Sequence, residues 1–78
     1  MKIEKLYYFL SVAKPLNFTR AAQECHIAQP AISEQISSLE RELGVQLFER
    51  GARSIRLTAE GEVFYQNISR FVQNYEQS

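Results

Sequence analysis

The chain has 78 residues, which is enough for one small domain and is near the size below which a hydrophobic core seldom stabilises a fold unaided. Nine basic residues balance nine acidic residues, and this net charge of +0 counts against an overall basic, nucleic-acid-binding surface. One cysteine excludes an internal disulfide, and the sequence has no secretion signal and no apolar run near the roughly 20 residues of a membrane span. We therefore expect a cytoplasmic domain that either dimerises or is part of a longer protein.

Two helices are predicted in the first third of the chain, at residues 2–14 and 18–25. Apolar residues recur with helical spacing in the first helix, and Pro15 ends it, because the residue before a proline is pushed out of the α region. Either Asn17 or Thr19 is suited to cap the second helix. Two adjacent alanines in that helix leave room for another helix to cross closely, which favours a packed helix pair.

A longer helix is predicted at about residues 29–43, with a proline in its first turn and Gly44 just past its end. Its apolar face repeats at i, i+4, i+7 and i+11 and consists of Ile32, Ile36, Leu39 and Leu43. The opposite face carries short or planar polar side chains and consists of Gln29, Ser33, Glu34, Ser37, Ser38 and Arg41. Glu40 is expected on the solvated surface, among weak ion pairs along the helix. Together with the preceding short helix, this helix matches a helix-turn-helix over about residues 18–37.

After this helix the pattern changes and predicts a two-stranded hairpin, or wing, at residues 45–57. Gly51 permits a tight turn, and residues 54–57 alternate polar and apolar as a short strand does. Arginines lie on and near the tip of this hairpin, at Arg50, Arg53 and Arg56. A local basic cluster is therefore present in a chain that has no net charge.

The last predicted helix follows Thr58, a suitable N-cap, and extends to about residue 77. Gly61 lies so close to the start of this helix that we expect it to cost little helix stability. Apolar residues recur along the helix at Phe64, Ile68, Phe71, Val72 and Tyr75. A small winged module is expected to cover only the first two turns of this apolar face, so the remainder is predicted to pair with the same helix of a second chain.

Several ordered segments resemble one known family; they are LYYF at residues 6–9, FTRAA at 18–22, AQPAIS at 28–33, LERELG at 39–44, LFER at 47–50 and LTAEG at 57–61. Over its whole length the chain resembles the N-terminal DNA-binding domain of LysR-type transcriptional regulators. The resemblance implies a mainly α-helical winged helix-turn-helix at residues 1–58, with a three-helix core and a two-stranded wing, followed by a linker and dimerisation helix at residues 59–78. It also implies that the full-length protein has a C-terminal domain that binds a small-molecule effector, which this chain does not contain.

The resemblance implies that the helix at residues 29–43 reads DNA in the major groove. Gln29 can bond to adenine N6 and N7, Ser33 can bond to several bases, and Pro30 or Ala31 can touch a thymine methyl group. Glu34 departs from the basic or neutral polar residues that are common in the family, and it either accepts a hydrogen bond from cytosine N4 or repels phosphate.

Arginines of the wing and the start of the second helix complete the predicted DNA contacts. Arg50 and Arg53 match wing positions that reach the phosphate backbone or the minor groove in the family. Thr19 either presents its hydroxyl and N–H groups to a phosphate or is a plain helix cap. The full set of candidate DNA-binding residues is Thr19, Gln29, Pro30, Ser33, Glu34, Ser37, Arg50 and Arg53.

These observations predict sequence-specific binding of double-stranded DNA by a homodimer, or by a higher oligomer of a full-length parent. By resemblance the target is an interrupted inverted repeat with A·T-rich edges. The alternative is a protein-interaction module whose last helix binds a partner helix, and the neutral net charge and Glu34 favour this alternative. No enzyme, metal or cofactor is expected, because Cys25 and His26 are the one cysteine and one histidine of the chain and no acid is placed to complete a triad. Cys25 is instead expected to be buried, and His26 to lie in the turn.

Overall fold

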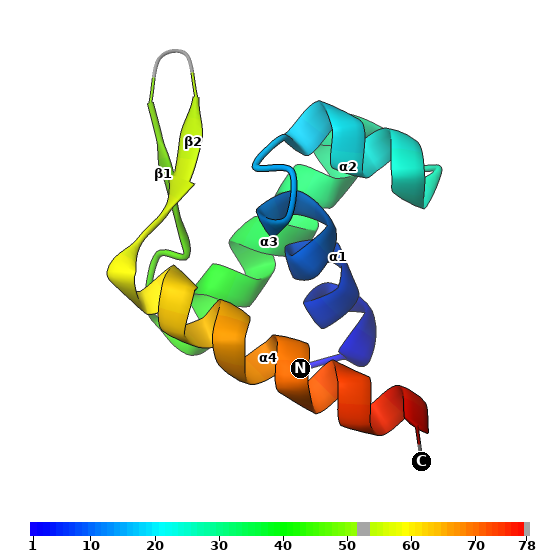
Figure 1. Cartoon of the computed structure of the whole chain (residues 1–78). Coiled ribbons are helices and arrows are strands. Elements are labelled where there is room, and N and C mark those ends of the chain that lie inside the picture. Colours follow the sequence, from blue (N-terminus) through cyan, green and yellow to red (C-terminus); the bar gives the residue numbers. More distant parts are fainter. Residues whose placement is uncertain (52–53, 78) are drawn as a thin grey trace.

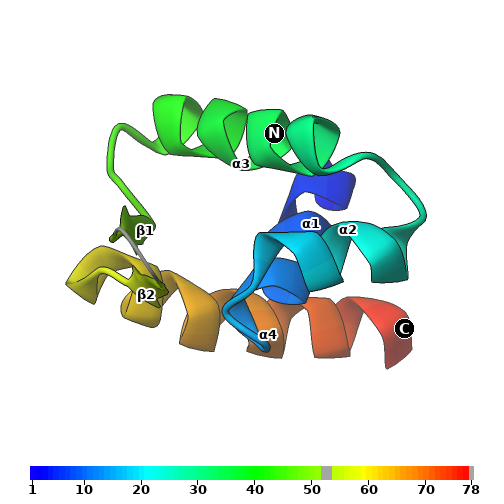
Figure 2. The same ribbon diagram turned by 90° about the horizontal axis from the view of Figure 1, so that it is seen from above.

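A computed structural model of the chain describes residues 1–51 and 54–77. Its elements are α1 (Ile3–Ala13), α2 (Phe18–Cys25), α3 (Gln29–Leu43), β1 (Phe48–Arg50), β2 (Ile55–Leu57) and α4 (Ala59–Gln77). The two strands form an antiparallel hairpin that stands away from the helices, and α1 and α2 lie between α3 and α4 (Figures 1 and 2). The predicted mainly helical fold with a two-stranded wing and a long last helix is therefore confirmed.

The core forms around α1, which packs against the other three helices. Phe9 is fully buried, and its ring contacts Phe48 at 5.5 Å and Phe64 at 5.1 Å between centroids. These tilted and edge-on arrangements are the ones that aromatic pairs prefer. One side chain of α1 thus joins the base of the wing to α4.

Local hydrogen bonds define the two ends of α2. Asn17, and not Thr19, caps α2, since its side-chain oxygen accepts a hydrogen bond from the Arg20 N–H at 2.9 Å. His26 ends α2 in the left-handed conformation, with φ of 58°, and lies exposed in the turn as predicted. Cys25 was expected to be buried but is only half-buried, and its thiol donates to the Ser11 hydroxyl at 3.5 Å. The turn therefore needs no ligand to account for its cysteine and histidine.

Hydrogen bonds hold the start of α4 against the segment that leads into the wing. The Thr58 hydroxyl oxygen accepts a hydrogen bond from the Gly61 N–H at 2.9 Å, which confirms Thr58 as the N-cap. The Thr58 backbone N–H donates to the Leu47 carbonyl at 3.0 Å. A Cβ added at Gly61 would lie only 2.1 Å from that same carbonyl oxygen. Gly61 is thus required for close approach of two backbones.

The apolar side chains of α4 divide into two rows. The inward row packs on the core, with Phe64 and Ile68 half-buried and Val72 only 6% exposed. The outward row is exposed to solvent and consists of Val63 at 61%, Phe71 at 51% and Tyr75 at 54%. One continuous apolar face in the sequence therefore serves two different surfaces.

The body of the domain covers more of α4 than the sequence suggested. The expectation that only two turns of α4 are covered is wrong, because Val72 is buried and α1 contacts α4 near its C-terminal end. There the Tyr7 hydroxyl donates to the Glu76 carboxylate at 2.8 Å, and this hydrogen bond raises the pKa of Tyr7.

In the part of the chain that the structure describes, no helix combines the length and apolar character needed to cross a membrane.

Candidate nucleic-acid interface

The side of α3 that points away from the core presents a continuous polar surface. Ile32, Ile36 and Leu39 are fully buried, and this fixes the rotation of the helix about its axis. The opposite side, called here the outer face, consists of Gln29, Pro30, Ser33, Glu34, Ser37 and Arg41. Five of these six residues were predicted to contact DNA, and Arg41 was seen only as part of the polar side of the helix. The structure brings the five together along about 12 Å of helix, at a rise of 1.5 Å per residue.

Thr19 lies beside the first residue of α3. It is the second residue of α2, and its hydroxyl is 3.4 Å from the side-chain oxygen of Gln29, to which it donates. Both side chains are exposed. The N-terminal turns of α2 and α3 therefore meet at one end of the outer face, where unpaired N–H groups and helix dipoles favour anions.

Arg50 is the last residue of β1, and its side chain reaches back to the helical body. Its guanidinium group is 3.8 Å from a carboxylate oxygen of Glu40, and its central carbon lies 5.3 Å from the centre of the Phe18 ring. The side chain keeps 44% of its surface exposed. An ion pair and a cation–π contact thus fix Arg50 next to α3 while leaving part of it open to a partner.

Glu40 is buried, in contrast to the prediction that it lies on the solvated surface. Only 5% of the residue is exposed, and its carboxylate accepts hydrogen bonds from the N–H groups of Leu47 at 2.7 Å and Phe48 at 3.3 Å. Glu40 follows the buried Ile36 by four residues, so its helical position indicated burial, but its charge favoured exposure. Its partners come from a segment that folds back on α3, and the helical pattern alone does not reveal them. Glu40 therefore positions the wing relative to the outer face.

Two further charged residues of the wing, Glu49 and Arg56, have exposed side chains. Glu49 pairs with Arg56 across the hairpin, and their side chains form an ion pair at 3.6 Å. Both are well exposed, so the pair adds little stability. Arg53, which was predicted to contact DNA from the tip, lies outside the described residues.

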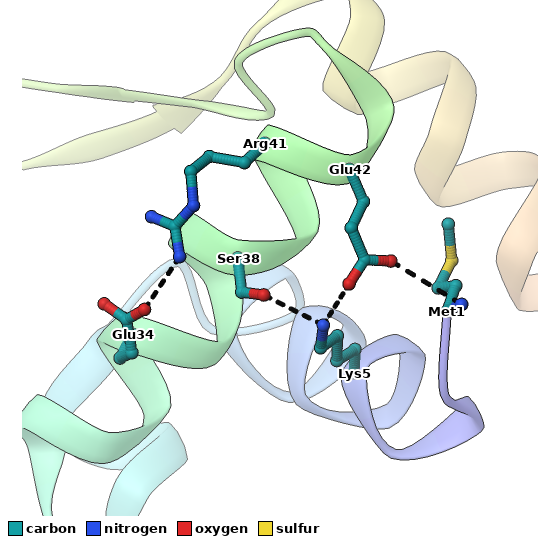
Figure 3. A network of polar contacts seen from close by, with 6 residues as sticks. All are labelled: Met1, Lys5, Glu34, Ser38, Arg41 and Glu42. Carbon is teal, nitrogen blue, oxygen red and sulfur yellow. Dashed lines mark hydrogen bonds and ion pairs between the residues drawn. The ribbon is translucent and has the colours of Figure 1, made fainter.

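A polar network fixes the far end of α3 to α1 (Figure 3). The Lys5 ammonium group donates to the Ser38 hydroxyl at 2.9 Å and also to the Glu42 carboxylate, which the N-terminal amine approaches at 3.7 Å. The hydrogen bond from Lys5 holds the pKa of Glu42 below its usual range. The network places the Glu42 carboxylate against two cations, so Glu42 does not act as a free negative charge.

Across residues 1–51 and 54–77, no three histidine, cysteine or acidic residues come together in a way that could hold a metal ion. The described polar groups of the interface are an amide, hydroxyls, the Glu34 carboxylate and two arginines. Such groups form hydrogen bonds and ion pairs with a polar macromolecule.

Comparison with curated proteins identifies the family. The model of the bacterial regulatory helix-turn-helix proteins of the lysR family matches residues 3–62. The transcriptional regulator BenM of Acinetobacter baylyi is 46% identical over 77 residues, which are 99% of this chain and 25% of BenM. The hca operon transcriptional activator HcaR of Escherichia coli is 45% identical over 76 residues, which are 97% of this chain and 26% of HcaR. The chain thus spans about a quarter of the length of these relatives.

Solved structures give the same result. The complex of the BenM DNA-binding domain with catB site 1 DNA matches with a TM-score of 0.94 and 45% identity, over 99% of this chain and 86% of that one. The CbnR DNA-binding domain in complex with DNA matches with a TM-score of 0.93 and 39% identity, over 99% of this chain and 88% of that one. The chain therefore belongs to the lysR family of bacterial regulatory helix-turn-helix proteins, in which it corresponds to the DNA-binding domain.

Proposed function

We propose that this chain binds double-stranded DNA sequence-specifically as a dimer, with α3 in the major groove. The observation that carries the proposal is the exposed outer face of α3, in a fold that matches two DNA-bound domains with TM-scores of 0.93 and 0.94. The side chains of this face are short or planar, so they allow the helix to approach base edges closely. The major groove of double-stranded DNA is wide enough to admit one α-helix, so α3 can enter it with the outer face toward the bases.

Base recognition is assigned to the N-terminal half of the outer face. Gln29 offers an amide that can bond to both adenine N6 and N7, and Ser33 offers a hydroxyl that accepts or donates. Pro30 has no N–H group and presents an apolar ring suited to a thymine methyl group. These contacts specify sequence, while the groups around them supply affinity.

Contacts with the DNA backbone are assigned to Thr19, Arg50 and Arg53. The Thr19 hydroxyl lies at a helix N-terminus, and Arg50 is held beside α3 by Glu40, so both can meet phosphates that flank the groove. Such contacts release condensed counterions, and the affinity should therefore fall steeply with salt.

Dimerisation is assigned to the last helix, with residues 59–78 as linker and pairing segment. Of the five residues predicted for this role, Phe71 and Tyr75 are exposed, and their rings stack at 6.4 Å between centroids. The others belong to the inward row and support the pairing surface from behind. A two-fold pair of this kind would present two copies of α3 to an interrupted inverted repeat, for which we propose A·T-rich edges.

Fluorescence anisotropy at two salt concentrations tests the proposed function. The chain is titrated against a pool of duplexes with A·T-edged interrupted palindromes and against a scrambled duplex. Tight, selective binding that weakens by orders of magnitude between low and moderate salt is expected. Weak binding that depends neither on the sequence of the duplex nor on the salt concentration would instead favour a module that binds a partner helix, because apolar pairing responds little to salt.

Removal of the wing-tip arginine tests the backbone and minor-groove contact. Arg53→Ala is expected to weaken binding to the best duplex by about 1 to 3 kcal/mol, the range for one good groove contact. Arg56→Ala is the matched control, because Arg56 is paired with Glu49 and its loss should have a smaller effect. Equal affinities of wild type and Arg53→Ala at matched salt would remove Arg53 from the interface.

Changes in the outward row test the assignment of α4. Phe71→Ser combined with Tyr75→Ser is expected to abolish pairing while leaving the circular dichroism spectrum and the unfolding transition nearly unchanged, because both side chains are more than half exposed. Leu16→Ser removes an exposed apolar side chain outside α4 and should leave pairing intact. Light scattering of the free chain and of its DNA complex gives the mass, and a wild-type chain that is monomeric in both would contradict the assignment.

A further inference from the structure

An ion pair occupies the middle of the outer face. The Arg41 guanidinium Nη2 donates to the Glu34 carboxylate at 2.8 Å, and each of the two side chains is 66% exposed (Figure 3). The two residues are seven apart, so they lie two turns apart on nearly the same line along the helix. That line is opposite the buried residues Ile32 and Leu39. A macromolecule that approaches the outer face therefore meets this pair.

The pair removes the effective charge of the one arginine on the outer face. A phosphate gains from an arginine mainly through the charge that it neutralises and the counterions that it releases. Arg41 is already neutralised by a carboxylate of its own helix, so its net contribution to such a contact is small. The pair is well solvated, however, and pairs of this kind are easily broken.

Arg41 also borders a place where an anion could be held. A surface hollow of about 400 Å³ lies between α3 and the start of the wing, and its lining includes Ser37, Arg41, Arg50 and the Glu40 that pairs with Arg50. Arg50 is already positioned there by Glu40 and Phe18. An Arg41 side chain that is released from Glu34 would add a second cation to this hollow.

We propose that Glu34 competes with DNA phosphate for Arg41 and so lowers the sequence-independent part of the affinity. This inference rests on the proposed function, because it assumes that the outer face meets DNA. In the wild-type chain Glu34 retains Arg41, and one phosphate contact is lost. Without the Glu34 charge, Arg41 turns to the phosphate backbone beside Arg50. Glu34 acts through Arg41 and reads no base.

The proposal gives a quantitative expectation for Glu34→Gln. One additional neutralised phosphate steepens the dependence of log Kd on log salt concentration by about 0.9. The variant should therefore bind a scrambled 25-base-pair duplex about tenfold more tightly at 50 mM salt and about threefold more tightly at 200 mM salt. The gain should be the same for the A·T-edged pool, since a phosphate contact carries no sequence information.

A double-mutant cycle separates this mechanism from simple repulsion between Glu34 and DNA. Binding of the scrambled duplex is measured by anisotropy for wild type, Glu34→Gln, Arg41→Gln and the double variant at both salt concentrations. The gain from Glu34→Gln should fall to less than about twofold once Arg41 is absent, because the gain depends on Arg41. A gain that persists in the Arg41→Gln background overturns the proposal in favour of direct repulsion.

Glu24→Gln is the matched control. This substitution also removes one negative charge and breaks one exposed ion pair on a helix, the pair between Glu24 and Arg20 at 3.4 Å. Glu24 is not part of the outer face, because it belongs to α2 and borders a hollow together with Tyr7 of α1 and Val72 of α4. Its effect should be less than about twofold, and an equal gain in this control would reduce the Glu34 effect to net charge and overturn the proposal. A change by Glu34→Gln that is confined to some sequences of the pool would mean that Glu34 reads a base, and would also overturn it. If no variant and no wild-type chain shows salt-sensitive binding, the proposed function fails and the inference fails with it.

Discussion

Gly61→Ala is expected to destabilise the domain by about 3 kcal/mol, although alanine is the better helix former. The added methyl group would lie 2.1 Å from the Leu47 carbonyl oxygen and 3.1 Å from the side chain of Leu57. The carbonyl cannot move away freely, because it accepts the Thr58 N–H and because the Leu47 N–H is held by Glu40. Either the start of α4 or the base of the wing must shift. Denaturant unfolding followed by circular dichroism measures the loss.

Gly44→Ala provides the control for this prediction. Gly44 ends α3 with φ of 73°, but a Cβ there would have no atom within 4 Å. Its substitution should cost about 1 kcal/mol, from the left-handed backbone alone. If both variants lost the same stability, the close approach of Gly61 to Leu47 would not be the cause. A gain in stability for Gly61→Ala would show that the two backbones are further apart.

Glu40→Ala is expected to cost about 3 kcal/mol and also to weaken DNA binding at temperatures at which the variant is folded. The substitution leaves the N–H groups of Leu47 and Phe48 without their acceptor in a buried place. It also frees Arg50 from its position beside α3. The wing then loses its fixed orientation relative to the outer face. Unfolding curves give the first effect, and anisotropy with the best duplex gives the second.

Glu40→Gln distinguishes the hydrogen bonds from the charge. Glutamine keeps a side-chain oxygen that can accept from Leu47 N–H, so the loss of stability should be about 1 kcal/mol. Arg50 would then rest on Phe18 without its ion pair, and binding should weaken less than in Glu40→Ala. Losses below about 0.5 kcal/mol in both variants, which is the usual range for surface positions, would contradict the structural role of Glu40.

The elements of the fold were largely predictable, because each one has its own periodicity and its own end signals. The helix predicted at residues 29–43 is α3, with a proline in its first turn and Gly44 at its end. The last helix was predicted to begin after Thr58, and the Thr58 hydroxyl caps α4 as expected. Short-range patterns suffice for such features, since a helix is defined by residues three and four apart.

The contacts that position the site were not predictable in the same way, because they join distant segments. The burial of Glu40 depends on N–H groups of the wing, and the need for Gly61 depends on a carbonyl that lies fourteen positions earlier in the chain. The pair between Glu34 and Arg41 does lie within one helix, but its seven-residue spacing is not one of the usual side-chain pairings. Long side chains that bridge two turns are recognised only in three dimensions.

The two rows of apolar side chains on α4 are subject to different constraints during evolution. A substitution in the inward row changes the free energy of unfolding, because these side chains pack on α1. A substitution at Phe71 or Tyr75 is expected to leave that quantity nearly unchanged, and in the proposed dimer it would alter what the helix pairs with. After gene duplication, two copies of such a domain can lose their affinity for each other through changes in the outward row alone. Related regulators in one cell can then avoid mixed pairs without any loss of folding.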